Sequence, residues 1–418
     1  MYRLLFFFSI GFPLLSLGQN SEVVNYDHIY KESIKSVKFT VKGLFLTYPI
    51  VDLQSNVQLQ LSFDDLDADN KNYSYYFVHC DQNWQPSQLT EMEYLEGFSE
   101  ERINDFRFSF NTIKTYTHYE VSLPNEYIRW TKSGNYLLIV FNEKTGEPII
   151  TRRFVVVENL VQIEPVMRRP AKASKTQTHH EIDFVVNLKQ FNVKNPRQEV
   201  KATILQNGRW DNAIQELPPL FIRGNQLLYD YQDKIVFPAM KEFRTLDLRT
   251  FRSLTQNIAS IERLDDVFEI QLYKDKKRFN QPYLFRQDLD GNFVVETFDR
   301  ANQDLSGDYA DVLFLLYSPT EYDEKEIFVT GGFADWEMLP YNKMTYNEMI
   351  KCYVAKVRLK QGLIDYGYAV KSSENQFSPN FDEIEGNWQE TNNMYTILIY
   401  YRPFGERYDR VIGAATLK

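Results

Sequence analysis

Hydrophobic and polar residues alternate along most of this chain. In Asn56–Leu66, the side chains of Val57, Leu59 and Leu61 fall on one face of an extended segment, and polar side chains fall on the other. The same period of two recurs in the segments EIDFVVNL, EVKATILQNGRW, VFEIQLYKD, DVLFLLYS, EIFVTGGF, CYVAKVRLKQG and MYTILIYYRP. This pattern predicts β-strands that bury one face.

Turn-forming residues separate the predicted strands. Asn135–Glu158 holds two strand patterns joined by residues 143–146, which predicts a β-hairpin. The pair Asp290-Gly291 favours a tight turn, and Pro238–Leu254 favours short turns over a long helix. Helical periodicity is scarce elsewhere, so the chain is predicted to be all-β and built from β-sandwiches.

Two breaks in the alternation predict domain boundaries. Residues 157–182 carry a stretch with Pro and Lys, and residues 296–312 are polar and rich in turn formers. We therefore expect three consecutive sandwich domains, at 26–159, 160–300 and 301–418. That number agrees with the usual size of about 100–200 residues per domain.

Composition and charge exclude several classes of protein. With 17 glycines and 16 prolines among 418 residues, the sequence is neither low-complexity nor fibrous. The 57 acidic and 47 basic residues give a formal charge of -10, which offers no electrostatic attraction to nucleic acid or anionic lipid. No nucleic-acid partner is expected, and the sequence indicates no oligomeric state.

The first residues have the pattern of a secretory signal. Arg3 precedes an apolar run from Leu4 to Leu17, and Ser16 and Gly18 are small residues placed for cleavage. The run is shorter than the ~20 apolar residues that span a bilayer. We expect a signal peptide at 1–18, and a soluble, exported mature protein without direct membrane insertion.

The segment YYFVHCDQNWQPS, Tyr75–Ser87, places a histidine beside a cysteine and so invites a nucleophile interpretation. Neighbouring strand residues point to opposite faces of a sheet, whereas a Cys–His pair needs its side chains within hydrogen-bonding reach. We therefore expect His79 and Cys80 on a strand and Trp84 capping the sandwich edge. Cys80 and Cys352, in different domains, are expected to be buried free thiols.

Two other groups resemble metal ligands. His179 and His180 have no further His or Cys nearby, and a tetrahedral site needs three or four ligands. Asp65, Asp67 and Asp69 alternate as in a calcium loop, but the Gly and Glu of that loop are replaced by Asn70 and Tyr76, which favours a polar hairpin loop. No catalytic, cofactor-binding or metal-binding residue is assigned, and no cofactor is expected.

The last predicted domain contains one more specific motif. VTGGFADWEML, Val329–Leu339, is followed by CYVAKVRLKQGLIDYGYAV, Cys352–Val370. This resembles the early-set immunoglobulin-like sandwiches, including the glycogen-binding type, over roughly forty residues. In a sugar binder of that type exposed aromatic rings stack on the sugar, and Trp336 and Trp388 are the candidates, against the alternative that they pack inside the fold.

Several segments together indicate a family. They are YDHIYKESIKSVKF, YYFVHCDQNWQPSQLTEMEYLEGF, YEVSLPNEYIRWTKSGNYLLIVF, LKQFNVKNPRQEVKATILQNGRWDNAI, FRQDLDGNFVVE and the GGFADW module. With them the mature chain resembles the plug protein family of the type IX secretion system of Bacteroidetes. The resemblance implies a non-enzymatic periplasmic protein, peripherally associated with an outer-membrane complex, that closes the giant translocon barrel when no cargo is in transit. A periplasmic glycan-binding accessory protein is the alternative, and a hydrolase has no residue pattern in its favour.

Overall fold

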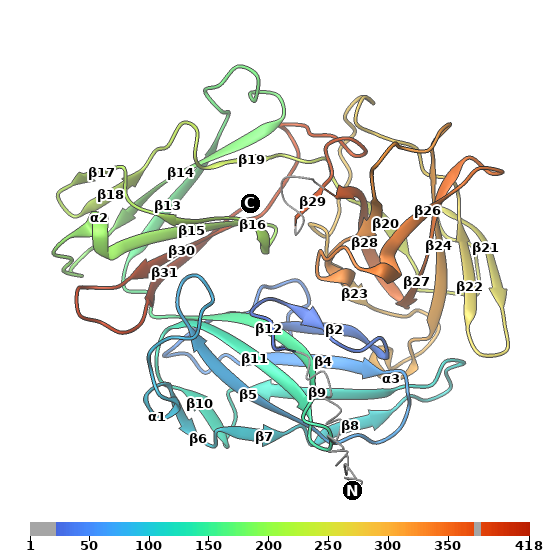
Figure 1. Cartoon of the computed structure of the whole chain (residues 1–418), viewed down its shortest axis with the longest axis horizontal. Helices are drawn as coiled ribbons and strands as arrows, with labels where there is room; N and C mark the ends of the chain where they lie inside the picture. Colours follow the sequence, from blue (N-terminus) through green and yellow to red (C-terminus); the bar gives the residue numbers. More distant parts are fainter. Residues whose placement is uncertain (1–21, 372–377) are drawn as a thin grey trace, which may run out of the picture.

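The structure, a computed structural model, describes residues 22–371 and 378–418, so the predicted signal peptide at 1–18 lies outside the described residues. Its strands form three β bodies around a common centre, with the first at the bottom of Figure 1, the second at the upper left and the third at the upper right. Strands make up 47% of the described residues and the helices among them are few and short, which confirms a mainly β protein. Within the described ranges, no helix combines the length and apolarity needed to cross a membrane.

The first body is a sandwich of a six-stranded and a four-stranded sheet, with a two-stranded ribbon beside them. Its elements are β1 (His28–Ile29), β2 (Ile34–Val41), β3 (Ile50–Asp52), β4 (Leu59–Asp65), β5 (Tyr73–Cys80), α1 (Glu91–Tyr94), β6 (Leu95–Gly97), β7 (Glu100–Arg102), β8 (Asp105–Phe108), β9 (Thr117–Leu123), β10 (Ile128–Trp130), β11 (Gly134–Asn142) and β12 (Pro148–Val157). The antiparallel pairing of β11 with β12 confirms the predicted hairpin.

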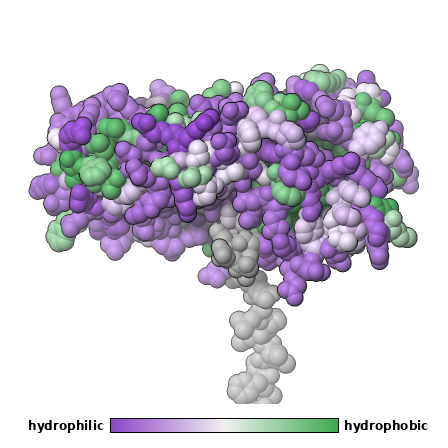
Figure 2. Space-filling view, turned by 90° about the horizontal axis from the view of Figure 1, so that it is seen from above, coloured by the Kyte–Doolittle hydropathy of each residue, from purple (hydrophilic) through white to green (hydrophobic). Residues whose placement is uncertain are grey.

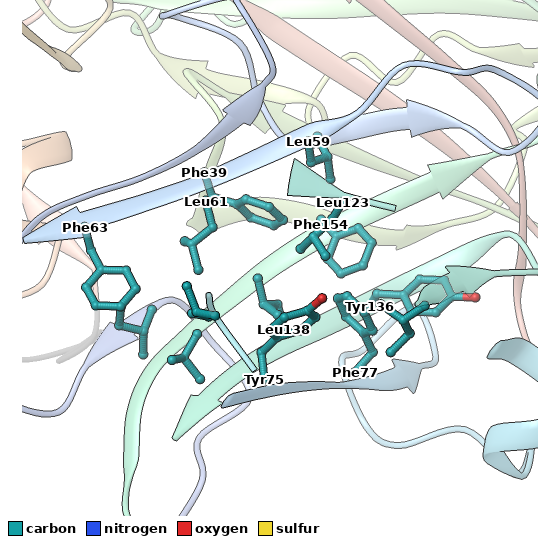
Figure 3. Packing of buried hydrophobic residues seen from close by; sticks show 14 of the residues in the cluster. Phe39, Leu59, Leu61, Phe63, Tyr75, Phe77, Leu123, Tyr136, Leu138 and Phe154 are labelled. Atoms are coloured by element: carbon teal, nitrogen blue, oxygen red, sulfur yellow. The ribbon is translucent and has the colours of Figure 1, made fainter. Parts of the chain in front are cut away.

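Aromatic and aliphatic side chains fill the space between the two sheets of the first body. Figure 3 shows Phe39, Leu61 and Phe63 from the four-stranded sheet facing Phe77 and Phe154 from the other. These positions alternate along their strands, as the sequence pattern requires. The first body therefore has a core of its own.

The second body draws its strands from two distant parts of the chain. Its elements are β13 (Gln162–Arg168), β14 (His179–Asn187), α2 (Pro196–Glu199), β15 (Val200–Gln206), β16 (Arg209–Leu217), β17 (Phe221–Arg223), β18 (Gln226–Tyr229), β19 (Val236–Pro238), β30 (Tyr395–Tyr401) and β31 (Arg410–Leu417). One sheet has the order β13-β14-β18-β17, with β19 also paired to β14, and the other has the order β16-β15-β30-β31.

The third body is built around a continuous ten-stranded sheet. Its elements are β20 (Arg244–Asp247), β21 (Ile258–Arg263), β22 (Phe268–Leu272), β23 (Phe293–Val295), α3 (Gln303–Ser306), β24 (Tyr309–Tyr317), β25 (Ile327–Thr330), η1 (Gly332–Ala334), η2 (Pro340–Asn342), β26 (Lys343–Asn347), β27 (Cys352–Lys360), β28 (Gly362–Lys371) and β29 (Pro379–Asn380). Pro238–Leu254 forms no long helix, in agreement with the prediction.

The strand pairing differs from three consecutive domains split at residue 300. β22 lies parallel to β24 in one sheet, β20 pairs with β28, and β30 pairs along its length with β15. The expected ranges 160–300 and 301–418 thus each contribute strands to both the second and the third body. Alternation identifies which face of a strand is buried, but it does not identify the neighbouring strand, and so it could not show this crossing.

This topology predicts the effect of removing the C-terminal strands. A chain ending at residue 393 lacks β30 and β31, which are half of one sheet of the second body, but keeps every strand of the third body. We expect the second body to unfold because its core loses Ile397 and Ile399 and exposes the edge of β15. Limited proteolysis followed by mass spectrometry should show early cleavage between residues 160 and 240 and a resistant fragment covering 244–371. Early cleavage of the third body instead would contradict the observed pairing.

Candidate functional site

His79 and Cys80 occupy opposite faces of β5, as predicted. The His79 ring lies within hydrogen-bonding distance of Ser87 Oγ, at 2.9 Å, and of the Ser133 carbonyl, at 3.1 Å, whereas Cys80 packs in a separate apolar cluster. Burial lowers the pKa of His79 to about 4 and raises the pKa of the Cys80 thiol to about 12. A buried, neutral thiol with no base beside it is a structural cysteine.

Trp84 does not cap a sandwich edge, which corrects the sequence interpretation. It is 1% exposed, its ring meets Trp210 of the second body edge-on at 4.7 Å, and the Arg153 guanidinium lies 4.5 Å from its centre. The segment that follows β5 therefore belongs to the junction between the first and second bodies. The sequence could not indicate this contact, because the partner ring of Trp210 is more than a hundred residues away.

An apolar cluster joins the first body to the second. Leu137 and Val155 of the first body are buried against Leu398, Tyr400 and Val411 of the second. The strand β30 is buried on both faces, since alternate residues enter the core of its own body and this junction. Burial on both faces explains why its residues 397–401, ILIYY, are continuously hydrophobic.

A glycine permits the close approach of the same two bodies. Gly208, in the turn between β15 and β16, has φ +67°, and a Cβ atom there would lie 1.8 Å from a ring atom of Tyr48 in the first body. A side chain at this position would force the Tyr48 ring to move. The turn therefore requires glycine for its backbone conformation and for the contact.

The first and third bodies are joined by a buried charged cluster. Asp64 of β4 is 1% exposed, and its Oδ2 accepts hydrogen bonds from Lys360 Nζ and Tyr309 Oη, both at 2.6 Å. Its Oδ1 lies 2.6 Å from Nδ1 of His118, which is directly opposite Asp64 on β9. The Lys360 ammonium also lies 4.1 Å from the centre of the Tyr116 ring.

The cluster holds Asp64 ionised. Burial alone would raise the pKa of this carboxyl, but the Lys360 charge and the hydrogen bond with His118 outweigh burial and hold the pKa below its usual value. A depressed carboxyl pKa stabilises the folded state at neutral pH, and this contribution is lost in acid, as the pH falls through the folded-state pKa. Two backbone amides continue the junction: Phe110 N donates to the Leu305 carbonyl, and Ile113 N donates to the Asp308 carboxylate.

The candidate sugar-binding residue Trp336 lies at the junction of the second and third bodies. The Arg209 guanidinium of the second body covers its ring at 4.7 Å, and Phe243 packs against it at 5.4 Å. Trp388 is partly buried and stacks on Tyr283 at 5.7 Å. Each ring therefore already has an aromatic partner within the fold, and Trp336 also has a cationic one.

The residues considered as metal ligands have other partners. His179 and His180 lie at the start of β14 rather than in a linker. The ring of His180 is hydrogen-bonded through Nδ1 to Tyr395 Oη, at 2.8 Å, and through Nε2 to the Gln389 carbonyl, at 2.7 Å. Lys71 lies among Asp65, Asp67 and Asp69 and forms ion pairs with all three. The loop carrying these acids connects β4 to β5 in different sheets, so it is not the hairpin that we expected.

Charged groups from all three bodies meet at a central cavity of about 580 Å³. Its lining includes Lys38 and Arg152 of the first body, Arg209 of the second and Asp335 of the third. Arg152 Nη2 lies 2.9 Å from Asp335 Oδ2 across the cavity wall. Burial lowers the pKa of Lys38 to about 8 and raises that of Asp335 to about 6. Burial therefore disfavours the charged form of both side chains.

Sequence reasoning missed Asp64, His118, Tyr309 and Lys360. Asp64 follows Gln60 and Ser62 on one face of β4, and this polar alternation is typical of a solvent-facing surface. The third body covers that face instead. The one local hint was a carboxylate, Asp64, in a strand with clear hydrophobic alternation. Nothing near it in the sequence indicated its partner Lys360, almost three hundred residues later.

These contacts characterise a mainly β protein in which buried residues at the junctions hold three bodies against one another. Residues 34–158 match the family model of the type 9 secretion system plug protein 1st domain, and the chain belongs to the family of these plug proteins. The matched range runs from the first residue of β2 to the residue after β12.

One solved structure extends the likeness over most of the chain. The crystal structure of a hypothetical protein from Parabacteroides merdae ATCC 43184 is 32% identical, with a TM-score of 0.91, and the match covers 95% of this chain and 100% of that one. The C-terminal domain of the Streptococcus pyogenes antigen I/II-family protein AspA is 8% identical over 91% of this chain and 98% of that one, with a TM-score of 0.15 that supports no comparison of folds. No curated protein matches the chain.

The buried charged cluster predicts unequal effects of two lysine substitutions on the same strand. Lys360→Met leaves Asp64 buried without its cation and should lower the free energy of unfolding by about 3–5 kcal/mol. Lys356→Met breaks the exposed pair with Glu269 and should change it by less than about 1 kcal/mol. Urea unfolding followed by tryptophan fluorescence measures both. Equal effects would show that the cluster does not hold the junction.

The cysteines give a second prediction. Both are free and buried, as the sequence predicted, and burial raises the pKa of each thiol. Ellman's reagent at pH 8 should therefore label neither thiol in the folded protein and both after unfolding in guanidinium chloride. Cys80→Ser should fold and cost at most about 3 kcal/mol, because it places a hydroxyl in an apolar cluster. Rapid labelling of native Cys80 would reopen the nucleophile interpretation.

Proposed function

We propose that this protein is a non-enzymatic plug that sits in the periplasm against the outer-membrane translocon barrel of the type IX secretion system. It closes that barrel when no cargo is in transit. The family match over residues 34–158 is the observation that carries the proposal. A barrel wide enough for folded cargo is an open hole when idle, and a plug needs a stable body with reversible affinity rather than catalysis.

The shape of the molecule suits this role. The three bodies together form a flat slab, which is broad in the view of Figure 1 and thin in the view of Figure 2. The junctions between the three bodies are buried and polar contacts cross them, so the slab resists bending. A rigid body loses little conformational entropy when it docks, and this lowers the cost of binding.

The surface favours a contact that can be released. The face shown in Figure 2 is mainly hydrophilic, with hydrophobic residues in separate groups. Exposed aromatic residues include Phe98, which stacks with Tyr127 at 6.5 Å, and Phe404 in the β30–β31 loop. Aromatic anchors surrounded by polar surface are typical of non-obligate interfaces.

Two finer expectations remain predictions. One is that the bodies are immunoglobulin-like or early-set sandwiches. The other is the alternative function, glycan binding through Trp336 and Trp388. Tight binding to starch, glycogen or peptidoglycan fragments, lost in Trp336→Ala or Trp388→Ala, would favour that alternative over the plug.

The plug proposal predicts a leak that depends on the translocon. Cells lacking this protein should take up large dyes or antibiotics that the outer membrane normally excludes, because the idle barrel stays open. Deletion of the translocon as well should restore the barrier. Uptake of a fluorescent dye measures both, and re-expression of the wild-type chain or of Lys356→Met should stop the leak. An intact barrier without this protein, or a leak that persists without the translocon, would contradict the proposal.

A further inference from the structure

Three carboxylates meet on the second body. Glu181 and Asp183 are two residues apart on β14 and so share one face of the strand, and Asp230 follows β18. The pairing of Phe184 with Tyr229 places Asp183 and Asp230 one step further along the same two strands. One oxygen from each of the three carboxylates lies within 4.8 Å of the others. Like charges in such positions on neighbouring strands repel.

The structure leaves this negative charge incompletely balanced. Asp183 is 6% exposed, and Arg168 Nε donates to its Oδ2 at 2.8 Å. Its Oδ1 is fully buried and has no hydrogen-bond partner among the described residues. Glu181 is also buried, and its Oε2 accepts a 3.3 Å bond from Ala171 N. Burial, together with the charges of Asp230 and Glu181, raises the pKa of Asp183 to about 6.

A second acidic group in the same protein shows how such charge can be neutralised from within the chain. Lys71 lies among Asp65, Asp67 and Asp69, and its ammonium reaches a carboxylate oxygen of each. At Asp183 one arginine, 61% exposed, contacts Oδ2 and leaves the buried Oδ1 without a partner among the described residues. This unpartnered oxygen is available to a cation from solution.

The number and chemistry of the ligands select the kind of ion. Calcium binds six to eight oxygens at about 2.3–2.6 Å, so two of its ligands can lie up to about 5 Å apart. Magnesium demands near-ideal octahedral geometry and usually binds through one or two carboxylates, so three carboxylates held on two strands favour calcium, whose coordination is flexible. We propose that Glu181, Asp183 and Asp230 form a calcium site, completed by water, that ties β14 to the end of β18. This inference does not depend on the proposed function.

Thermal unfolding of the purified chain tests the site. After treatment with EDTA and buffer exchange, 1 mM CaCl2 should raise the Tm of the wild-type protein by about 2 °C or more, since a ligand that binds the folded state stabilises it. The same concentration of MgCl2 should have a smaller effect. Asp230→Asn changes an exposed residue and should fold. It should raise the Tm in EDTA by relieving repulsion, and it should abolish the calcium shift.

Asp233→Asn is the matched control, because it removes the same charge from an exposed residue three positions away. It should keep the calcium shift of the wild-type protein. Absence of a calcium shift in the wild-type protein, or an equal shift in Asp230→Asn, would overturn the site. An equal or larger shift with magnesium would overturn the assignment to calcium.

Discussion

The arrangement of the three bodies depends on the buried contact of Asp64 with Lys360. Neither charge could be buried alone, because an unpaired ion in a protein interior costs several kcal/mol. Each is provided by a different body, so the charges are satisfied when the first and third bodies are together. Tyr309 and His118 complete the partners of the carboxylate. A contact of this kind has one geometry, and it therefore fixes how the two bodies are oriented.

The path of the chain reinforces that constraint. It leaves the second body after β19, builds the third body, and returns through β30 to complete a sheet of the second. The second and third bodies are thus joined by two chain crossings. The strand that returns is the one whose outer face packs on the first body through Leu398 and Tyr400. Loss of any one junction therefore disturbs the other two.

The sequence predicted the strands better than their partners. Alternation identified the β11–β12 hairpin and the opposite faces of His79 and Cys80, because these depend on local geometry. The usual burial of cysteine predicted the two buried thiols. The pairing of β30 with β15 and the contact of Trp84 with Trp210 depend on residues more than a hundred positions apart, which a periodic pattern does not encode. The charged cluster was missed for the same reason, since a polar strand face covered by another body has the same sequence pattern as one covered by water.

A rigid slab held by buried contacts is the physical basis for a plug, and hydrogen exchange at the first–third junction tests it most directly. The amides of Phe110 and Ile113 donate across that junction to Leu305 and Asp308. If the three bodies open as one unit, these amides should exchange as slowly as those of the β11 core strand, with the same dependence on denaturant. Much faster exchange at the junction, while β11 stays protected, would show that the bodies separate independently and would contradict this account.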